Sequence, residues 1–197
     1  MINSRPSINF PWWRFLLPFC LQLAVILFVP ARSAYTYNFG MDAVIQTVPV
    51  DPYDLLRGYS QTLRYEKISR TSELQQLPGG NDLSPGDLFY VILAADSQPE
   101  KSPPAPWKAI KVTQDLPQDL PQNRVAIKGK VEKYRTISYG LETYYMPESQ
   151  RKKINQEIRD LQGDSDGNRA FVVEIKVDRR GNAVPISLWV GDNNYRF

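Results

Sequence analysis

An apolar run near the amino terminus constrains this chain more than any other feature of its sequence. From Phe15 to Val29 the residues read FLLPFCLQLAVILFV, and Gln22 is the one polar side chain among them. This run is short for a bilayer span, but the stretch from Phe10 to Ala34 reaches the length that a membrane helix needs. Two tryptophans and an arginine come directly before it, in the manner of interfacial anchors. We therefore expect residues 1–36 to form a cytoplasmic tip and a membrane anchor.

The charges on either side of the run predict the orientation of this anchor. Arg5, Arg14 and the amino terminus lie before it, and Arg32 lies just after it. Because positive charge is retained on the cytoplasmic side, we expect a single pass through the cytoplasmic membrane with the amino terminus inside. Residues 37–197 would then form a domain outside the cytoplasm, in the periplasm or an equivalent lumen, while Phe15–Val29 contacts the lipid bilayer.

Two other interpretations of the run stay open. The first is a cleaved signal peptide, since Val29-Pro30-Ala31 places short residues at a candidate cleavage site. The second is a buried helix of a soluble domain, which Pro18 and Pro30 make awkward. A lipoprotein signal at Cys20 does not fit, because the apolar run continues beyond the cysteine.

Residue types that are missing from the sequence exclude several classes of function. The chain of 197 residues has no histidine and one cysteine, so intrachain disulfides, Cys/His zinc sites and histidine-based triads are excluded. Ser149 and Lys152 fit the S-x-x-K pattern without its companion motifs. Asp164–Asn168 begins like a calcium loop but lacks the later ligands. We expect no cofactor and no metal.

Alternating apolar and polar residues predict a domain built mainly of strands. Period-two alternation is typical of strands with one buried face, and turn residues separate the segments here. Gly86–Ala95 is apolar almost throughout, so we expect it to be a central strand buried on both faces. The other expected extended segments are Asp42–Val50, Gly58 through Glu66, Trp107–Val112, Arg124–Tyr134, Ile137–Tyr145, Phe171–Val177 and Val184–Val190.

Other patterns predict the connections and one helix. We expect a polar link at Ser33–Met41 and two extended, proline-rich loops within residues 97–123. Pro147 to Leu161 reads as an amphipathic helix, because its apolar residues recur at helical spacing. That apolar stripe consists of Ile154, Ile158 and Leu161.

The final segments read as a hairpin across Asp178–Asn182. Pro185 cannot donate a ladder hydrogen bond, so we expect an edge position there. On the second strand we expect one common face made of Val184, Ile186, Leu188 and Val190. The expected fold is a β-rich α+β protein: a transmembrane helix, then one mostly antiparallel β domain with a single amphipathic helix and a C-terminal hairpin.

Three blocks of the sequence resemble the GDYXXLXY family, a group of bacterial membrane-associated proteins without an established biochemical activity. The first block, Val48–Ser69, reads VPVDPYDLLRGYSQTLRYEKIS, with Tyr59 and Ser60 where the family usually has Asp and Tyr. Gly86–Leu93 is similar to the family's second strand signal, and Tyr139–Glu148 to its Y-G-x-E-x-Y-x-x-P-E signature. The matching residues of the first block are Val50, Asp51, Pro52, Asp54, Leu55, Arg57, Gly58, Leu63 and Tyr65.

If the first and third blocks meet in space, they bring carboxylates, arginines and tyrosines to one place. Three interpretations stay open: a buried network that fixes strand register, a groove for a ligand or partner, and acid/base catalysis by carboxylates such as Asp51, Glu142 or Glu148. The candidate binding residues are Asp51, Asp54, Arg57, Arg64, Tyr139, Glu142, Tyr145 and Glu148, with Glu66 nearby.

We expect the domain to be a membrane-anchored binding or accessory module and not an enzyme. Members of the family that it resembles are often encoded beside polytopic membrane proteins, which implies a partner of that kind. An envelope hydrolase and a structural domain on lipid headgroups are the alternatives. The net charge of +3 does not indicate nucleic acid. The basic residues that could contact headgroups, or simply form a solvated strand face, are Lys108, Lys111, Arg124, Lys128, Lys130 and Lys133.

Overall fold

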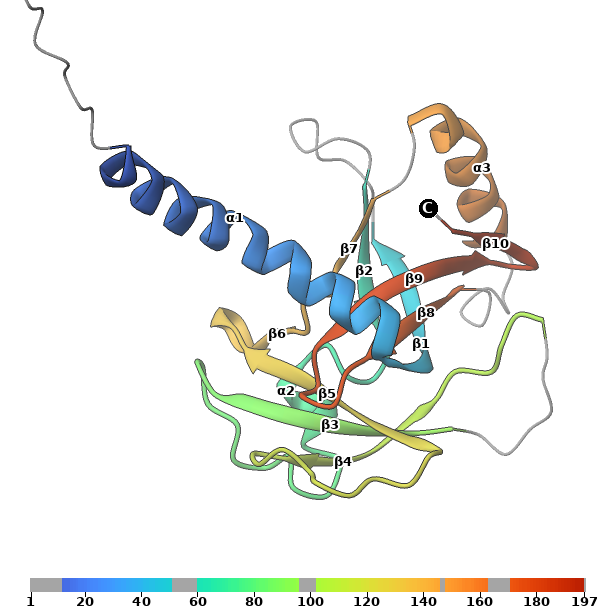
Figure 1. Ribbon diagram of the computed structural model, residues 1–197. Coiled ribbons are helices and arrows are strands. Elements are labelled where there is room, and N and C mark those ends of the chain that lie inside the picture. Colours follow the sequence, from blue (N-terminus) through green and yellow to red (C-terminus); the bar gives the residue numbers. More distant parts are fainter. Residues whose placement is uncertain (1–11, 51–59, 96–101, 146–147, 163–170, 197) are drawn as a thin grey trace, which may run out of the picture. The chain divides into compact units, whose positions relative to one another are not determined.

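The computed structural model describes residues 12–50, 60–95, 102–145, 148–162 and 171–196. The chain forms two compact units, Met1–Ala34 and Tyr35–Phe197. The second unit contains both β-sheets and the hydrophobic core (Figure 1).

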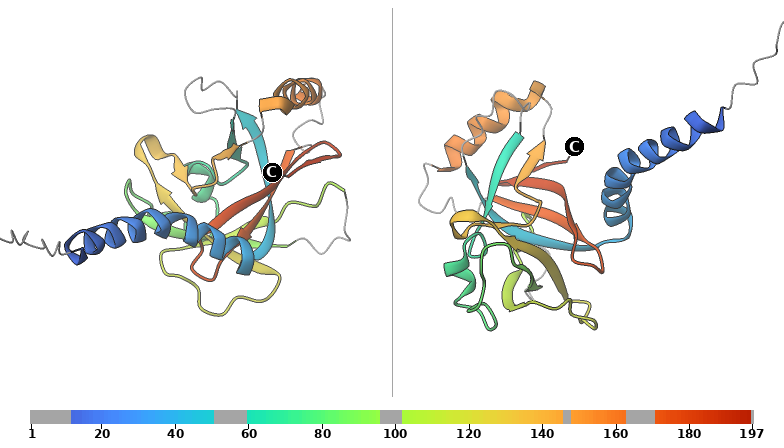
Figure 2. Two further views of the ribbon diagram at one scale, coloured as in Figure 1. Left: turned by 45° about the horizontal axis from the view of Figure 1, so that its top comes forward. Right: turned by 90° about the vertical axis from the view of Figure 1, so that its left-hand side faces the viewer.

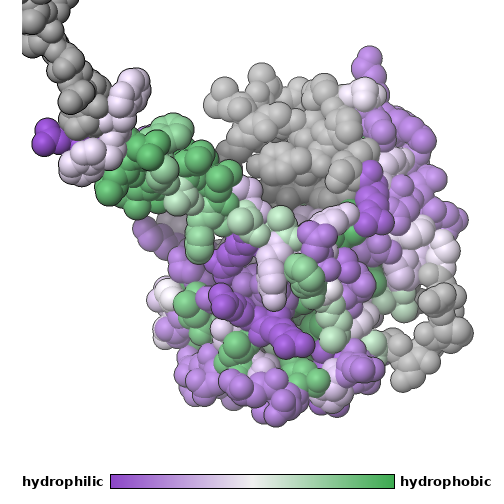
Figure 3. Space-filling view, viewed as in Figure 1, coloured by the Kyte–Doolittle hydropathy of each residue, from purple (hydrophilic) through white to green (hydrophobic). Residues whose placement is uncertain are grey.

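One long helix, α1 (Trp13–Phe39), contains the apolar run and continues beyond it. Its large apolar side chains from Phe15 to Phe28 are exposed and give the helix an almost unbroken apolar surface (Figure 3). No single straight helix in the described residues is long and apolar enough to cross a membrane, whereas Trp13–Phe28 and Pro30–Phe39, bent by 41°, qualify as a pair. Pro30 accounts for the bend, because it lacks the N–H that would bond one turn back.

The helix includes Ser33–Phe39, so the prediction of a polar link to Met41 is wrong. Neither glycine nor proline occurs between Pro30 and Gly40, and nothing local stops the helix there. Gly40 ends it by donating its N–H to the Thr36 carbonyl at 2.8 Å. A Cβ at Gly40 would lie 2.5 Å from that same oxygen, which is why a larger residue does not fit.

The larger sheet has six strands among the described residues, in the order β10-β9-β8-β1-β2-β7, and all of its pairings are antiparallel. β1 is internal, because it pairs with β2 on one side and with β8 on the other. The strands are β1 (Met41–Val50), β2 (Ser60–Tyr65), β7 (Thr143–Tyr145), β8 (Phe171–Val177), β9 (Ala183–Val190) and β10 (Asn193–Tyr195).

The smaller sheet has four strands in the described part of the chain, in the order β4-β3-β5-β6, and is also antiparallel. Its strands are β3 (Leu88–Ala94), β4 (Lys108–Thr113), β5 (Arg124–Val131) and β6 (Ile137–Ser138). β3 is central, as predicted, but Leu88 is 51% exposed and Tyr90 only half-buried. The expectation that both of its faces are buried is therefore wrong at the beginning of the strand.

The core lies between the inner faces of the two sheets, which face each other in both views of Figure 2. Among the side chains that the structure describes, alternate residues of β1, β2 and β8 are buried in this core, and so are alternate residues of β3 and β5, as the period of a strand requires. The buried side chains include Ala43, Ile45, Leu63, Tyr65, Val173 and Ile175 from the larger sheet, and Phe89, Val91, Leu93, Val125 and Ile127 from the smaller.

Short helices complete the domain. The amphipathic helix is confirmed as α3 (Arg151–Gln162), preceded by a 3-10 turn, η2 (Glu148–Gln150), with Ile154 and Ile158 buried. The expectation of a single helix is wrong, because α2 (Thr71–Leu74) follows β2 and η1 (Lys133–Arg135) joins β5 to β6. A helix of four residues is too short to show an apolar period.

The C-terminal hairpin is confirmed as β8–β9, but a third strand, β10, continues the meander. The register shifts between Glu174 and Ile175, so that Val173 opposes Leu188 while Lys176 opposes Val184. The predicted common face of Val184 and Leu188 is therefore wrong, since one extra residue in β9 moves the side chains beyond it to the other face. The edge position of Pro185 is confirmed, because β10 pairs only with Leu188–Val190.

Candidate binding cleft

The side chains of three of the eight predicted site residues lie within the part of the chain that the structure describes. Asp51, Asp54 and Arg57 lie outside the described residues, as do the side chains of Tyr145 and Glu148. Arg64, Tyr139 and Glu142 are described. They come from the two sequence blocks that were expected to meet.

Strand pairing does bring these two blocks together. β2 and β7 are antiparallel neighbours, with Ser60 opposite Tyr145 and Thr62 opposite Thr143. Beyond the ladder, the Leu63 N–H donates to the Glu142 carbonyl at 2.8 Å. The motif segments therefore form adjacent strands of the larger sheet.

Tyr139 is a core residue whose hydroxyl and N–H both bond within the domain. Its hydroxyl donates to the Ile68 carbonyl at 2.8 Å, and its N–H donates to Glu142 Oε1 at 2.5 Å. Its ring meets Tyr65 and Phe89 edge-on, with centroids 6.3 and 6.4 Å apart. Burial, then the charges of Glu142 and Glu73, raise the pKa of Tyr139 well above its ordinary value of 10.0.

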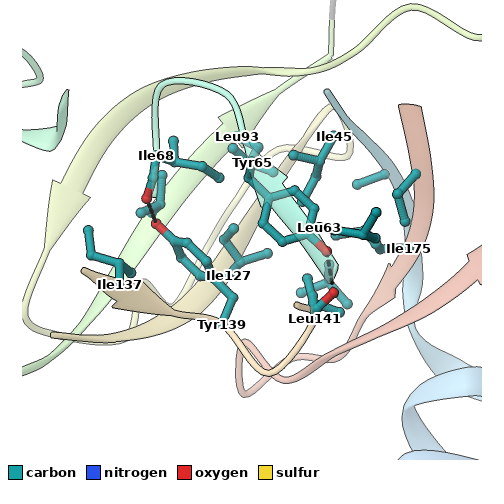
Figure 4. Close-up of a cluster of buried hydrophobic side chains, with 14 of the residues drawn as sticks. Ile45, Leu63, Tyr65, Ile68, Leu93, Ile127, Ile137, Tyr139, Leu141 and Ile175 are labelled. Carbon is teal, nitrogen blue, oxygen red and sulfur yellow. Dashed lines mark hydrogen bonds between the residues drawn. The ribbon is translucent and has the colours of Figure 1, made fainter. Parts of the chain in front are cut away.

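Tyr65, on β2, is likewise a core residue whose hydroxyl bonds a distant backbone carbonyl. Its hydroxyl donates to the Leu141 carbonyl at 2.5 Å, and Ser69 Oγ bridges its backbone N–H and carbonyl at 2.8 Å each. The two tyrosines lie side by side in the core, and each bonds the segment that carries the other (Figure 4). Burial and the Glu142 carboxylate raise the pKa of Tyr65 well above 10.0.

Arg64 is separated from this pair. It lies between Leu63 and Tyr65 on β2 and is exposed, whereas both of its neighbours are buried. Successive side chains of a strand point to opposite faces, so the arginine cannot join Tyr139 and Glu142 in one site. Of the described members of the predicted constellation, Tyr139 and Glu142 lie together, beside Tyr65, which was not among the predicted residues, and Arg64 is a separate exposed cation.

A cleft of about 560 Å³ opens where the two sheets meet, and we call it the sheet-junction cleft. Its apolar lining comes from β1, the β2–α2 turn, the segment after α2, β3, and the start of β4 with the segment that leads into it. The lining residues are Ile45, Gln46, Glu66, Lys67, Ile68, Glu73, Gln76, Leu77, Leu93, Pro106, Trp107, Lys108 and Ala109.

The tyrosine pair supports one wall of this cleft from behind. The Ile68 carbonyl is held by Tyr139, and the adjacent Ser69 is held by Tyr65. The Ser69 and Arg70 N–H groups then donate to Glu73 Oε2 at 2.8 and 3.0 Å, which fixes the start of α2. The signature residues thus determine the shape of the wall without lining it.

Two further features fix the mouth of the cleft. Lys67 adopts φ of 63°, in the left-handed region that residues other than glycine rarely occupy. The Trp107 N–H donates to the Val44 carbonyl at 2.8 Å and ties the lead-in of β4 to the larger sheet. Sequence reasoning did not predict this site, and the isolated Trp107 among prolines was the one local signal for it.

The described lining of the cleft lacks several residue types that commonly act in catalysis. It contains no serine, threonine, cysteine or histidine, and its two glutamates are matched by two lysines. Glu73 is committed to backbone N–H groups through Oε2. No group of three metal-binding side chains occurs among the described residues. Ser149 and Lys152 of the S-x-x-K pattern are both exposed, and the calcium-like loop lies outside the described residues.

The family model described as GDYXXLXY protein matches residues 22–188, from within α1 to β9. The chain belongs to the GDYXXLXY family. The match contains both tyrosines of the core pair and every residue that lines the cleft, so these features belong to the GDYXXLXY part of the chain. No curated protein and no solved structure matches it.

Proposed function

We propose that this GDYXXLXY protein is a single-pass membrane protein whose domain binds an apolar segment of a partner membrane protein. The observation that carries the proposal is the composition of the sheet-junction cleft. Its floor is apolar, its rim carries equal numbers of acidic and basic side chains, and its described lining has no serine, threonine, cysteine or histidine.

The size and lining of the cleft suit one or two apolar side chains of a partner segment. Ligand pockets typically enclose about 300–1,000 Å³, and the cleft lies within that range at about 560 Å³. Binding energy concentrates in anchor side chains that enter well-packed apolar pockets surrounded by polar groups. Leu77 and Trp107 are partly buried against the core and offer such a surface, with Lys67 and Glu66 at the rim.

The helix supports the membrane part of the proposal. Its 27 residues extend about 40 Å at 1.5 Å per residue, close to the thickness of a bilayer with its headgroups. Aromatic residues stand at both ends, where the two interfaces would lie. They are Trp12 and Trp13 at one end and Tyr35, Tyr37 and Phe39 at the other.

The test is photo-crosslinking in intact membranes. A photoreactive phenylalanine analogue replaces Gln76, which is exposed at the rim of the cleft, and a matched variant carries it at Lys152, exposed on α3. We expect the Gln76 variant alone to form a discrete adduct with one membrane protein. Adding Ala109→Phe, which fills the cleft, should abolish that adduct.

Two results would contradict the proposal. One is the same set of adducts from both positions, and the other is an adduct that survives Ala109→Phe in a protein with an unchanged melting temperature. Thermal melts of each variant in detergent show whether a missing adduct results from a blocked cleft or from an unfolded domain.

A further inference from the structure

Another cavity lies within the unit Tyr35–Phe197, beside the last residue of α1, and we call it the helix-end pocket. Its volume is about 700 Å³. Three segments far apart in the sequence surround it: the end of α1 with the start of β1, the loop before β5, and the β8–β9 turn. Its lining residues are Phe39, Gly40, Met41, Leu116, Pro117, Gln118, Asp119, Leu120, Arg124, Val125, Ala126, Val177, Asp178 and Arg179.

The apolar side of this pocket is contiguous with the end of the apolar helix. Phe39 is 74% exposed and Met41 is 42% exposed, although both are large apolar residues. Leu116 and Leu120 line the same pocket from the loop before β5 and are half-buried. Exposed apolar side chains in such a position mark a surface that something apolar covers.

The polar side of the pocket offers charges of both signs. Arg124 and Arg179 are exposed, and neither forms an ion pair within the part of the chain that the structure describes. Asp178 cannot serve a ligand, because its two oxygens accept bonds from Thr36, Arg180 and Asn182. Asp119 is thus the acidic group that remains available, beside two arginines.

Two guanidinium groups, one carboxylate and an apolar wall match the headgroup of a phosphatidylethanolamine. Guanidinium groups bind phosphate oxygens through paired N–H donors, and a carboxylate accepts from a primary ammonium. We propose that the helix-end pocket binds a phospholipid of this zwitterionic class, with Arg124 and Arg179 on the phosphate and Asp119 on the ammonium. The inference rests on the proposed membrane anchor, since a bilayer would place such a lipid beside Phe39.

The test is a titration of the full chain, purified in a maltoside detergent, with dihexanoyl phosphatidylethanolamine. We expect one saturable site by calorimetry. Arg124→Ala and Arg179→Ala should each weaken binding by about tenfold or more, because each removes charge-assisted hydrogen bonds. The matched control is Arg135→Ala, an exposed arginine of the β5–β6 turn outside the pocket, which should bind as wild type does.

Asp119→Asn distinguishes the headgroup class. It should weaken binding of the ethanolamine lipid and leave dihexanoyl phosphatidylglycerol, which has no ammonium, unaffected. Absence of saturable binding by wild type, or unchanged binding by both arginine variants, would overturn the proposal. So would full displacement of the lipid by an equal concentration of inorganic phosphate, which would make the pocket a phosphate site.

The outcomes of the lipid titration do not depend on whether the sheet-junction cleft binds a partner. The short-chain lipid reaches the pocket in detergent without insertion of the helix, so a failed titration contradicts lipid binding alone. A failed crosslink at Gln76, in contrast, contradicts the partner proposal and leaves the titration unchanged.

Discussion

The hydroxyl of Tyr139 satisfies a buried carbonyl that has no other bond partner among the described contacts. Tyr139→Phe would keep the ring between Tyr65 and Phe89 but leave the Ile68 carbonyl unsatisfied. We expect the free energy of unfolding to fall by about 1–3 kcal/mol, as measured by denaturant melts of the full chain in detergent. Tyr134→Phe is the matched control, because that side chain is 94% exposed. Equal melting of wild type and Tyr139→Phe would contradict this account.

The same two tyrosines predict sensitivity to alkali. The folded state raises the pKa of Tyr65 and Tyr139 above 10.0, so the unfolded chain releases these protons first as the pH rises. The contribution of the two protonated tyrosines to the free energy of unfolding is complete below pH 10.0. Above that pH it falls by about 1.4 kcal/mol per pH unit for each tyrosine. Stability measured from pH 9 to 11 should fall less steeply in Tyr139→Phe than in wild type. An identical slope would contradict the predicted titration.

Lys67 combines a strained backbone with a place at the mouth of the cleft. A left-handed conformation costs a residue with a Cβ about 1–2 kcal/mol, and glycine avoids that cost. We expect Lys67→Gly to leave the melting temperature unchanged or higher while it weakens the crosslink from Gln76. Lys133→Gly, in an exposed turn away from the cleft, is the control. A Lys67→Gly variant that melts lower would show that this conformation carries no strain.

At the scale of elements, the β8–β9 turn joins three parts of the domain. Asp178 accepts a hydrogen bond from Thr36 in the last turn of α1, at 2.9 Å, and three more from its own turn. On the other side, the Gly181 carbonyl accepts from the Lys128 N–H of β5 at 2.8 Å. The end of α1 is therefore fixed to both sheets through one turn.

Asp178→Asn should destabilise the domain, because the new amide nitrogen would face the Asn182 donor. We expect a loss of about 1–3 kcal/mol in thermal or denaturant melts, and a smaller loss, about 1 kcal/mol, for Thr36→Val. Thr113→Val, which removes an exposed hydroxyl bond, is the control. A Thr36→Val variant equal to wild type would show that the end of the helix is not held by this bond.

The lowered pKa of Asp178 makes the stability of the domain depend on pH in the acid range. Burial acts to raise this pKa, but the hydrogen bonds from Asn182, Arg180 and Thr36 outweigh it, and the pKa lies below the ordinary value of 3.8. The contribution of Asp178 to stability is thus present above pH 3.8 and is lost as the pH falls through the lower folded value. Asp178→Asn should remove that part of the acid dependence.

At the scale of the whole molecule, the apolar helix and the sheet domain predict an integral membrane protein. Wild type should stay with the membrane pellet on carbonate extraction. Leu23→Arg combined with Ile26→Arg should release it, since each arginine near the centre of a span costs about 2.5–3.5 kcal/mol. Lys152→Ala is the control. Release of the wild-type chain would contradict the anchor, and a mature protein that begins at Arg32 or Tyr35 would indicate cleavage.

The sequence alone determined the elements that depend on local pattern. The alternation of β5 and β8, the apolar stripe of α3 and the turn at Asp178–Asn182 are all visible within about ten residues, and the structure has each of them. Pro185 predicted an edge because a missing N–H is a property of one residue. The family blocks were also visible as strings of residues, and their pairing as β2 and β7 agrees with the expectation that they meet.

Only the tertiary structure decided how these elements share two sheets and where a cleft opens. Ile137–Tyr145 reads as one extended segment, but Gly140 turns at φ of 75° and sends β6 and β7 to different sheets. Tyr139 reads as a site residue because it is polar, yet its hydroxyl bonds a carbonyl 71 residues away and belongs to the core. The last turn of α1 is bonded to Asp178, which lies 142 residues beyond Thr36. Local periodicity in the sequence cannot predict contacts between such distant residues, because these contacts form only after distant segments have packed together.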